Sequence, residues 1–420
     1  CLRSIDSYHT MHLRQIFLAA FLFPVLTSAE SRLPANARVA IIGDSITEQK
    51  LYSRFIETYL LACTGRHDIK CFQFGWSGET ASGFNNRLEN DLSAFRPTVA
   101  TTCYGMNDGR YVPYAENIGA DYEKNMRQVV TKLKAMGVQQ IVLGSPGAVD
   151  TTYFVKPGTT ADQYNDSLAH LRDIDRKLAA EFQTGFADVH DEMIDAMIPA
   201  KAKLGAEYDV CGRDGVHPGA NGHVLMAAAF LKGLGLDGNI GELTVDMKGA
   251  SAGSEGHKVA GSNGVAEVES SKWPFFLEPS MRSILPFCDF NEKLNRLTLR
   301  VQNLSSAKAK VTWGNESHEF TREQLATGIN LADVFDKTPF EQAFIQLVIA
   351  VNNKQAYETP MIKGMITNFR NFAADAQNDP EFAAALETLK AKMMANQEKL
   401  DAEVHAKLVP VKHVIKVEAL

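Results

Sequence analysis

Between Ala37 and Leu236, short apolar runs rich in β-branched residues alternate with longer segments whose apolar positions recur at helical spacing. This alternation is typical of βαβ units, which build a parallel sheet covered by helices on both faces. It predicts strands at Arg38–Ile42, Ile69–Phe74, Val99–Tyr104, Gln140–Leu143 and Gly185–Val189. It predicts helices at Leu51–Ala62, Asn85–Phe95, Ala120–Met136, Asp162–Phe182, Asp191–Lys203 and Gly222–Lys232. The pattern therefore predicts a three-layer α/β domain, in which ligands bind beyond the carboxyl ends of the strands.

The pattern changes after Leu236, where glycine, serine and other small residues dominate the stretch from Gly249 to Gly264. Further strands are predicted at Glu242–Met247, Gly264–Val268, Leu294–Leu304, Ala309–Trp313, His318–Phe320 and Val411–Val417. Helices are predicted at Phe340–Asn352 and Pro380–Leu408. We expect a first domain at 30–236, a linker or hairpin at 237–270, and an accessory β-rich and helical region at 271–420.

The second of these C-terminal helices begins with Asp379 as N-cap and Pro380 at the first helical position. Its apolar side chains form a stripe close to helical period, made of Phe382, Leu386, Leu389, Met393, Leu400, Val404 and Leu408. Such a stripe usually packs on a core. A role as a lid or as a surface for a partner is the alternative.

The first 29 residues are typical of an export signal preceded by a short upstream stretch. His12 and Arg14 come before an apolar run from Ile16 to Leu26, and Thr27-Ser28-Ala29 offers small residues for cleavage. That run is too short to span a bilayer, and no later segment reaches the eighteen or more apolar residues needed. A buried N-terminal helix is the alternative. We expect a secreted or periplasmic protein that starts at Glu30 and has no integral membrane segment.

Charge and composition narrow the class of partner. The formal net charge is −7, with 45% hydrophobic and 22% charged residues, which is ordinary for a globular protein of two or three domains. A weakly acidic surface gives no electrostatic reason to bind nucleic acid or an anionic membrane. Neutral small molecules or glycans suit such a surface better.

Five cysteines remain after Glu30, namely Cys63, Cys71, Cys103, Cys211 and Cys288. An odd number spread over a long chain is not a dense disulfide framework, and none of the five has metal-ligand spacing. Cys63 and Cys71 bracket a short polar turn, so one bridge between them is compatible with an oxidising compartment. Cys103 lies in an apolar run, which is typical of an inert core thiol.

The strongest candidate for chemistry is Ile41-Ile42-Gly43-Asp44-Ser45, where a buried strand ends just before a helical segment. Gly43 permits a tight turn there. The N-terminus of the helix places free backbone N–H groups and a positive dipole end beside the Ser45 hydroxyl. Ser45 is therefore a candidate nucleophile. An ordinary N-cap formed by Asp44 or Ser45 is the alternative.

A serine nucleophile needs a histidine base that a carboxylate orients. His217 lies in Asp214-Gly215-Val216-His217-Pro218, a loop just ahead of the last helix of the α/β domain. The spacing of three residues lets Asp214 fold back on the imidazole. His190, in Asp188-Val189-His190 at the end of a predicted strand, is the weaker candidate, because a carboxylate–imidazole contact is harder to form in an extended strand than in the loop around His217.

Acyl transfer also needs hydrogen-bond donors for a developing oxyanion. The second strand is followed by Gly75-Trp76-Ser77-Gly78-Glu79, and the third by Gly105-Met106-Asn107-Asp108. Both segments lie on the ligand side of the predicted sheet. The Gly78 backbone N–H, the Asn107 side-chain amide and the Ser45 backbone N–H are the candidate donors. A turn glycine and a turn asparagine are the alternatives for the first two.

Taken in order, these four blocks resemble those of the SGNH hydrolase superfamily, also called GDSL-like esterases, of an exported bacterial type. The resemblance covers about Val39 to Leu236 and weakens beyond it. It implies a flavodoxin-like sheet, no metal, no organic cofactor and a catalytic triad. In that triad Ser45 is the nucleophile, His217 the base and Asp214 its partner, while Ser45, Gly78 and Asn107 form the oxyanion hole.

The resemblance implies a serine ester hydrolase that works through an acyl-enzyme, acting on a small-molecule or glycan ester. Export and the added β-rich region favour a carbohydrate O-acetylesterase. A lipase or lysophospholipase is the alternative, with Trp76, Met106 and Tyr111 as candidate linings of an acyl groove. A non-catalytic glycan-binding or scaffolding protein is the alternative of another class. The complete set of five site residues argues against it.

Overall fold

The computed structural model describes residues 33–420. The expected export signal and the residues before it lie outside the described residues. Five parallel strands form the central sheet of the N-terminal half, in the order β2-β1-β3-β4-β5. They are β1 (Arg38–Gly43), β2 (Lys70–Gly75), β3 (Val99–Cys103), β4 (Gln140–Gly144) and β5 (Gly185–Ala187). The predicted parallel α/β domain is confirmed.

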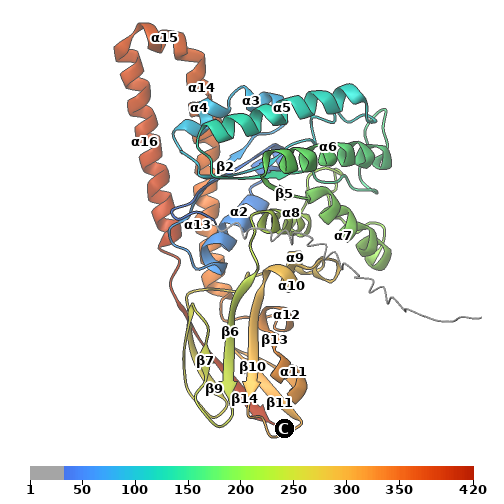
Figure 1. The fold of residues 1–420 in the computed structure, drawn as a ribbon, viewed down its shortest axis with the longest axis vertical. Coiled ribbons are helices and arrows are strands. Elements are labelled where there is room, and N and C mark those ends of the chain that lie inside the picture. The colour runs from blue at the N-terminus through green and yellow to red at the C-terminus, as the bar shows by residue number, and fades with distance from the viewer. Residues whose placement is uncertain (1–32) are drawn as a thin grey trace, which may run out of the picture. The chain divides into compact units, whose positions relative to one another are not determined.

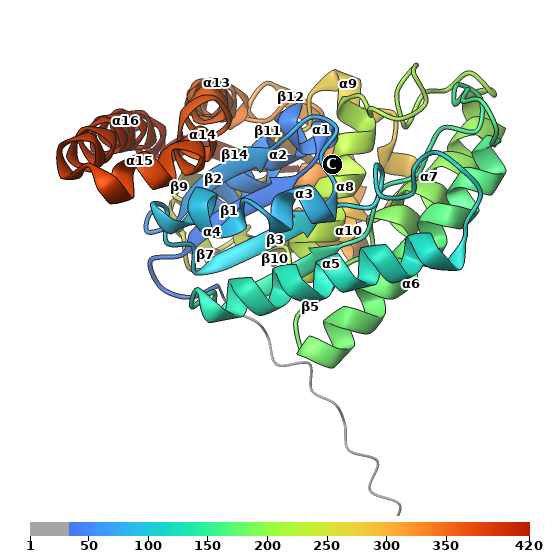
Figure 2. The same cartoon turned by 90° about the horizontal axis from the view of Figure 1, so that it is seen from above.

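Helices cover both faces of this sheet (Figure 2). They are α1 (Ser45–Glu48), α2 (Tyr52–Thr58), the π-helical turn η1 (Tyr59–Cys63), α3 (Ala81–Asn85), α4 (Leu88–Ser93), α5 (Glu116–Ala135), α6 (Ala161–Phe182), α7 (Val189–Leu204) and α8 (Ala220–Gly233). Side chains alternate between the faces of a strand. Accordingly Val39 and Ile41 of β1 join the core with α2, α7 and α8, whereas Ala40 and Ile42 join the core with α3 to α6.

Two local predictions differ from the structure. The strand expected at Gly185–Val189 ends at Ala187, because Asp188 caps α7 by accepting a hydrogen bond from the Asp191 N–H at 3.1 Å. The single helix expected at Asn85–Phe95 is two short helices, α3 and α4, separated near Asn86. Neither difference changes which strand ends face the ligand side of the sheet.

The C-terminal half contains two further sheets (Figure 1). Their strands are β6 (Asn239–Asp246), β7 (Ala252–Gly253), β8 (His257–Ala260), β9 (Val265–Ser270), β10 (Arg296–Gln302), β11 (Lys308–Trp313), β12 (Glu316–Thr321), β13 (Ile329–Asn330) and β14 (Val411–Ala419). One sheet has the order β13-β10-β6-β7 and the other β12-β11-β14-β9-β8. The segment 237–270 is expected as a linker or hairpin. It supplies four strands, β6 and β7 to the first of these sheets and β8 and β9 to the second.

Short helices and one long helical hairpin complete this half of the chain. The short elements are α9 (Pro279–Arg282), η2 (Leu285–Phe287), α10 (Phe290–Leu294), α11 (Arg322–Thr327) and α12 (Leu331–Val334). The hairpin consists of α13 (Glu341–Thr359), η3 (Pro360–Ile366), α14 (Thr367–Phe369), η4 (Arg370–Phe372), α15 (Ala373–Asn378) and α16 (Pro380–His405). Its helix α13 contacts α2 and β2 of the N-terminal half as well as α16. None of the helices in residues 33–420 combines the length and apolar character that a membrane span requires.

The helix α16 buries part of the apolar stripe that the sequence predicted: Val404 is fully buried, and Met393 and Leu408 pack against the core. Its buried residues are Gln397, Asp401 and Val404, while Leu389 is 39% exposed. Gln397 donates from Nε2 to the Glu358 carboxylate of α13 at 3.0 Å. The buried face of α16 therefore coincides with the predicted stripe, but polar side chains occupy part of it.

A buried chain of hydrogen bonds joins the two C-terminal sheets, and we call it the buried histidine relay. Trp313 Nε1 donates to His413 Nδ1 at 3.1 Å, and His413 Nε2 lies 2.9 Å from Ser270 Oγ. Ser270 Oγ lies 2.7 Å from His257 Nδ1, and His257 Nε2 lies 3.0 Å from the Ile240 carbonyl oxygen. An indole N–H only donates and a carbonyl only accepts, so every intermediate proton is assigned. His413 donates to Ser270, Ser270 donates to His257, and both imidazoles are neutral.

All five cysteines in residues 33–420 are free thiols. Cys63 and Cys71 are buried and are not bridged to each other. Burial raises the pKa of Cys63, Cys71, Cys103 and Cys211 well above the ordinary value. These four thiols are therefore protonated packing groups, and none has the lowered pKa of a reactive cysteine.

Candidate active site

Ser45 begins α1 at the carboxyl end of β1, the place that the sequence indicated. A Cβ atom at Gly43 would lie 2.1 Å from Thr47 Oγ1 and 2.8 Å from the Cys103 carbonyl oxygen, so only glycine lets this turn pack so closely. Asp44 is the N-cap, and its Oδ1 accepts from the Ile46 N–H at 2.9 Å. Since Asp44 performs the capping, the Ser45 hydroxyl is left for another partner.

That partner is His217. The Ser45 Oγ lies 2.8 Å from His217 Nε2, and His217 Nδ1 lies 2.6 Å from Asp214 Oδ2. A carboxylate can only accept here, so Nδ1 carries the proton and Nε2 accepts from the serine hydroxyl. Three sequence-predicted residues are thus brought together in the arrangement of a Ser-His-Asp triad.

The carboxylate of Asp214 is held by its own loop. Its Oδ1 accepts from the Val216 and His217 backbone N–H groups, both at 2.9 Å. Partial burial acts to raise the pKa of Asp214, but the hydrogen bonds from His217 and Val216 outweigh it and lower the pKa below the ordinary value. Asp214 therefore stays ionised and fixes the imidazole in the required tautomer, even though its side chain is 57% exposed.

The loop after β2 presents Gly78 in a tight turn. The Trp76 N–H donates to the Gly43 carbonyl at 3.0 Å, and the Glu79 N–H donates back to the Trp76 carbonyl at 3.1 Å. Gly78 has φ of +72°, and a Cβ atom there would meet nothing within 4 Å. Its backbone therefore borders open space next to the turn that carries Ser45.

The orientation of the Asn107 side chain is fixed by two neighbours. Nδ2 donates to the Glu79 carbonyl at 3.0 Å, and Oδ1 accepts from the Tyr111 hydroxyl at 3.2 Å. A backbone carbonyl cannot donate, so the nitrogen must face Glu79, and one N–H of Nδ2 remains for another acceptor. Sequence reasoning found Asn107 but gave Tyr111 only a lining role, because the four-residue separation carries no signal for this contact.

Asp108 ties the two oxyanion loops together. Its Oδ2 accepts from the Gly105 N–H and its Oδ1 from the Ala81 N–H, both at 3.0 Å. Burial raises the pKa of Asp108 to about 6, and burial likewise raises the pKa of Asp44 to about 7. Two buried acidic side chains thus support the turns around the triad.

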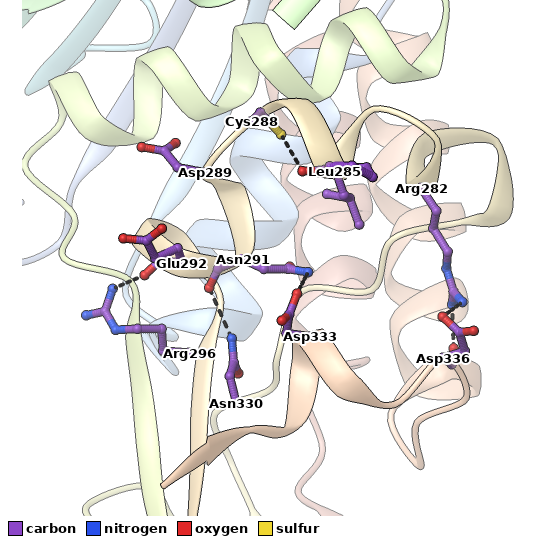
Figure 3. Close-up of a pocket in the computed structure, with 11 residues that line it drawn as sticks. Arg282, Leu285, Cys288, Asp289, Asn291, Glu292, Arg296, Asn330, Asp333 and Asp336 are labelled. Carbon is purple, nitrogen blue, oxygen red and sulfur yellow. Dashed lines mark hydrogen bonds and ion pairs between the residues drawn. The ribbon is translucent and has the colours of Figure 1, made fainter. Parts of the chain in front are cut away.

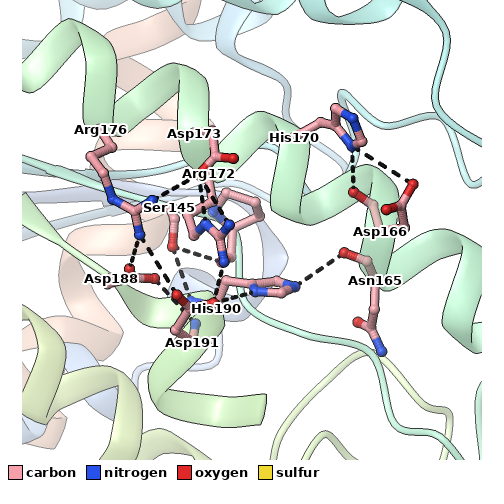
Figure 4. Close-up of polar contacts among 11 residues, drawn as sticks. Ser145, Asn165, Asp166, His170, Arg172, Asp173, Arg176, Asp188, His190 and Asp191 are labelled. Carbon is pink, nitrogen blue, oxygen red and sulfur yellow. Dashed lines mark hydrogen bonds and ion pairs between the residues drawn. The ribbon is translucent and has the colours of Figure 1, made fainter. Parts of the chain in front are cut away.

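His190, the weaker candidate base, is placed elsewhere (Figure 4). Its Nδ1 lies 3.1 Å from Asp191 Oδ1 and its Nε2 lies 3.1 Å from the Asn165 carbonyl oxygen, so both ring nitrogens are occupied. The nearby Ser145 hydroxyl accepts from the His190 backbone N–H at 3.0 Å and donates to the Pro146 carbonyl at 3.0 Å. This cluster stabilises the start of α7 and offers no nucleophile.

A separate polar pocket of about 640 Å³ lies among α9, α10 and α12 (Figure 3). Its polar side chains already pair with each other. Arg282 Nη1 donates to Asp336 at 2.7 Å, and Asn291 Nδ2 donates to Asp333 at 3.0 Å. The pocket contains no serine and no histidine, so it lacks the groups for acyl transfer.

The parallel sheet and the Ser-His-Asp arrangement at its carboxyl edge define the class as a serine ester hydrolase. Residues 41–225 match the model of the GDSL-like Lipase/Acylhydrolase family. This match spans most of the α/β domain and agrees with the resemblance of the sequence motifs to the SGNH hydrolase superfamily.

Individual relatives are distant in sequence. The chain is 24% identical over 227 residues to an acetylxylan esterase of Geobacillus stearothermophilus, covering 49% of this chain and 97% of that protein. A solved structure of a gut microbial diltiazem-metabolizing enzyme is 21% identical, with a TM-score of 0.71, over 93% of this chain and 99% of that one. A crystal structure of the Geobacillus acetylxylan esterase aligns over 49% of this chain and 96% of that one, at 22% identity and a TM-score of 0.40. The second of these comparisons shows that the fold of the C-terminal half also occurs elsewhere together with the α/β domain.

Proposed function

We propose that Ser45, His217 and Asp214 carry out ester hydrolysis through an acyl-enzyme. The observation that carries this proposal is the continuous hydrogen-bond chain from Ser45 Oγ to His217 Nε2 and from His217 Nδ1 to Asp214. His217 takes the proton as the serine oxygen attacks the ester carbonyl, and the ionised Asp214 stabilises the resulting imidazolium. The same imidazolium then protonates the departing alcohol.

The Gly78 N–H, the free N–H of Asn107 Nδ2 and the Ser45 N–H stabilise the oxyanion. One such donor contributes roughly 10²–10³ in rate. In the second half of the reaction His217 deprotonates a water molecule, which attacks the acyl-Ser45 carbonyl and releases the acid. No step requires a metal ion or an organic cofactor.

The substrate class that we propose is an O-acetylated carbohydrate. The similarity to an acetylxylan esterase supports it, because 97% of that relative aligns with 49% of this chain. Export to the cell exterior or periplasm, as the N-terminal sequence suggests, places such an enzyme near polymeric glycans.

A lipase or lysophospholipase is the second candidate, and two of the three side chains proposed to line its groove, Met106 and Trp76, disfavour it. Met106 is 2% exposed and belongs to the core. The Trp76 ring lies under the Arg87 guanidinium at 4.5 Å and near Lys363 Nζ at 5.1 Å. The Trp76 ring therefore carries two cationic groups on its surface, which is unsuited to a long acyl chain.

Two measurements test this function. A fluorophosphonate probe should label the wild-type protein but not a Ser45→Ala variant, and absence of labelling would favour a non-catalytic binding protein. Acetate release from acetylated xylan, mannan and pectin, together with acetyl, butyryl and octanoyl aryl esters, tests the substrate. Each methylene that fits an apolar groove adds about 0.8 kcal/mol of binding, so a specificity constant that rises toward octanoyl would overturn the acetylesterase proposal.

A further inference from the structure

The helix η3 of the C-terminal hairpin contacts the turn that carries Ser45. Lys363 Nζ lies 2.9 Å and 3.0 Å from the two carboxylate oxygens of Glu48, the last residue of α1. The same Glu48 carboxylate accepts a hydrogen bond from the Ser77 backbone N–H. Ser77 directly precedes Gly78, so a continuous chain of contacts runs from Lys363 to the oxyanion loop.

A second and independent chain connects α13 to the same turn. The buried Glu358 carboxylate accepts from the Gln73 backbone N–H of β2 at 2.9 Å. The Gln73 side chain in turn donates to the Thr47 carbonyl of α1 at 2.6 Å. Glu358 is itself fixed by Lys354, whose Nζ lies 3.0 Å from it. Two parts of the hairpin therefore reach α1, one at Thr47 and one at Glu48.

The oxyanion loop is held from its other side as well. Arg87 Nε donates to the Glu79 carboxylate at 2.7 Å, and the Arg87 guanidinium covers the Trp76 ring. Trp76 thus lies between Arg87 from α4's start and Lys363 from η3, which anchors the loop on both sides of Gly78. An isolated, exposed ion pair contributes little to stability. The Lys363–Glu48 pair differs because its carboxylate also holds a backbone N–H of the loop.

We propose that Lys363 is a positioning residue of the active site: it holds the Glu48 carboxylate against the Ser77 N–H and so aims the Gly78 N–H at the oxyanion. This inference rests on the proposed function of Gly78. It assigns the C-terminal hairpin an indirect part in acyl transfer, through the loop that carries Gly78.

The test compares Lys363→Met and Lys363→Arg in the full chain with Lys390→Met as the matched control. Lys390 forms a similar pair with Glu387 on α16 and is similarly exposed, 25% against 30% for Lys363. We expect Lys363→Met to lower kcat about tenfold. This is less than the roughly 10²–10³ contributed by one oxyanion donor, because the variant misplaces the Gly78 N–H without removing it. KM and the melting temperature should stay close to wild type. Lys363→Arg should restore most of kcat, and Lys390→Met should match wild type throughout.

A second readout does not depend on turnover. Trp273 and Trp313 are at most 1% exposed, so acrylamide quenching of tryptophan fluorescence reports mainly on Trp76. Lys363→Met should increase this quenching and Lys390→Met should not. An unchanged kcat in Lys363→Met would overturn the inference, and so would a loss of kcat matched by a lower melting temperature. If the wild-type protein hydrolyses no ester, the proposed function fails. Independently of that result, unchanged quenching in Lys363→Met would reject the positioning role of Lys363.

Discussion

Two chains of hydrogen bonds in this protein pass from a serine hydroxyl to a histidine. In the triad, Ser45 Oγ lies 2.8 Å from His217 Nε2. In the buried histidine relay, Ser270 Oγ lies 2.7 Å from His257 Nδ1 and 2.9 Å from His413 Nε2. Distance does not distinguish them. They differ in the partner of the far nitrogen of each imidazole, which is the ring nitrogen that does not contact the serine. They also differ in how exposed the histidine is.

The far nitrogen of His217 faces the Asp214 carboxylate, which stabilises a positive imidazole. The far nitrogens of the relay histidines face an indole N–H and a backbone carbonyl. The indole N–H disfavours a second proton on His413, and neither histidine has a carboxylate to balance the charge. His217 is 36% exposed, whereas His257 and His413 are 5% and 6% exposed. A serine next to a histidine therefore becomes a nucleophile only where the imidazole can accept a proton and a substrate can approach.

The largest effect should separate the two serines. Ser45→Ala should lower ester turnover by roughly 10⁴–10⁶, because it removes the attacking oxygen. Ser270→Ala should leave turnover near wild type but destabilise the protein by about 1–3 kcal/mol, because it removes the shared partner of two buried imidazoles. Steady-state kinetics and urea unfolding of both variants measure these effects. A large loss of turnover in a folded Ser270→Ala variant would contradict the comparison.

The second largest effect concerns the Asp214 carboxylate, which the triad has and the buried histidine relay lacks. Asp214→Asn should reduce kcat by roughly 10²–10⁴, since the amide no longer enforces the tautomer or balances the imidazolium. Asp166→Asn is the matched control, because Asp166 lies 3.7 Å from His170 on the surface of α6, where no serine completes the set. Kinetics at fixed pH measures both variants. Equal activity in the two would remove Asp214 from the mechanism.

Acid should destabilise the relay. Burial lowers the pKa of His413 from 6.5 to about 4, and burial also lowers the pKa of His257. Between these values the unfolded chain binds more protons than the folded one. The contribution of the neutral histidines to the free energy of unfolding is therefore complete above pH 6.5 and falls as the pH drops toward 4. For His413 the loss is about 3 kcal/mol.

Urea unfolding at a series of pH values measures this loss. His413→Gln should flatten the dependence in that window. His318→Gln, which changes a half-exposed histidine of the same region, should not. A wild-type free energy of unfolding that stays constant from pH 6.5 to 4 would show that the relay histidines are not held neutral.

The smallest effect concerns the donor that sets the direction of the relay. Trp313→Phe keeps most of the ring but removes the N–H that reaches His413 Nδ1, and should cost about 1–2 kcal/mol of stability. Combining it with His413→Gln in a double-mutant cycle should give a coupling of about 0.5 kcal/mol or more. Strict additivity would mean that the hydrogen bond does not contribute.

Much of the α/β domain could be predicted because its signals are local. The runs that became β1 and β4 were placed to within one residue at each end, since a fully buried strand is a continuous apolar run. The sequence also pointed to Ser45, Asp214 and His217, which lie within hydrogen-bond distance of each other, because each follows a strand or precedes a helix in a short block. Gly78 and Asn107 stay predictions as oxyanion donors. What failed locally was Val189, where the side chain of Asp188 starts a helix instead of continuing a strand.

Contacts between distant parts of the chain could not be predicted. Lys363 and Glu48 are 315 positions apart, and Trp313 and His413 are 100 apart. The sequence around a single lysine does not indicate which acidic residue that lysine pairs with in the fold. The polar residues on the buried face of α16 could not be predicted for the same reason, because Gln397 pairs with Glu358 on another helix.

The position of β14 constrains how the protein can be synthesised. This strand follows β9 and β11 in the sequence, yet it lies between them in the middle of its sheet. On the ribosome, β9 and β11 are made first and expose unpaired edges until β14 emerges. A slip of one residue on insertion would also turn His413 away from Ser270. A chain whose translation stops before Val411 therefore lacks the central strand of this sheet. It exposes two strand edges with unpaired backbone groups, which chaperones or proteases can bind.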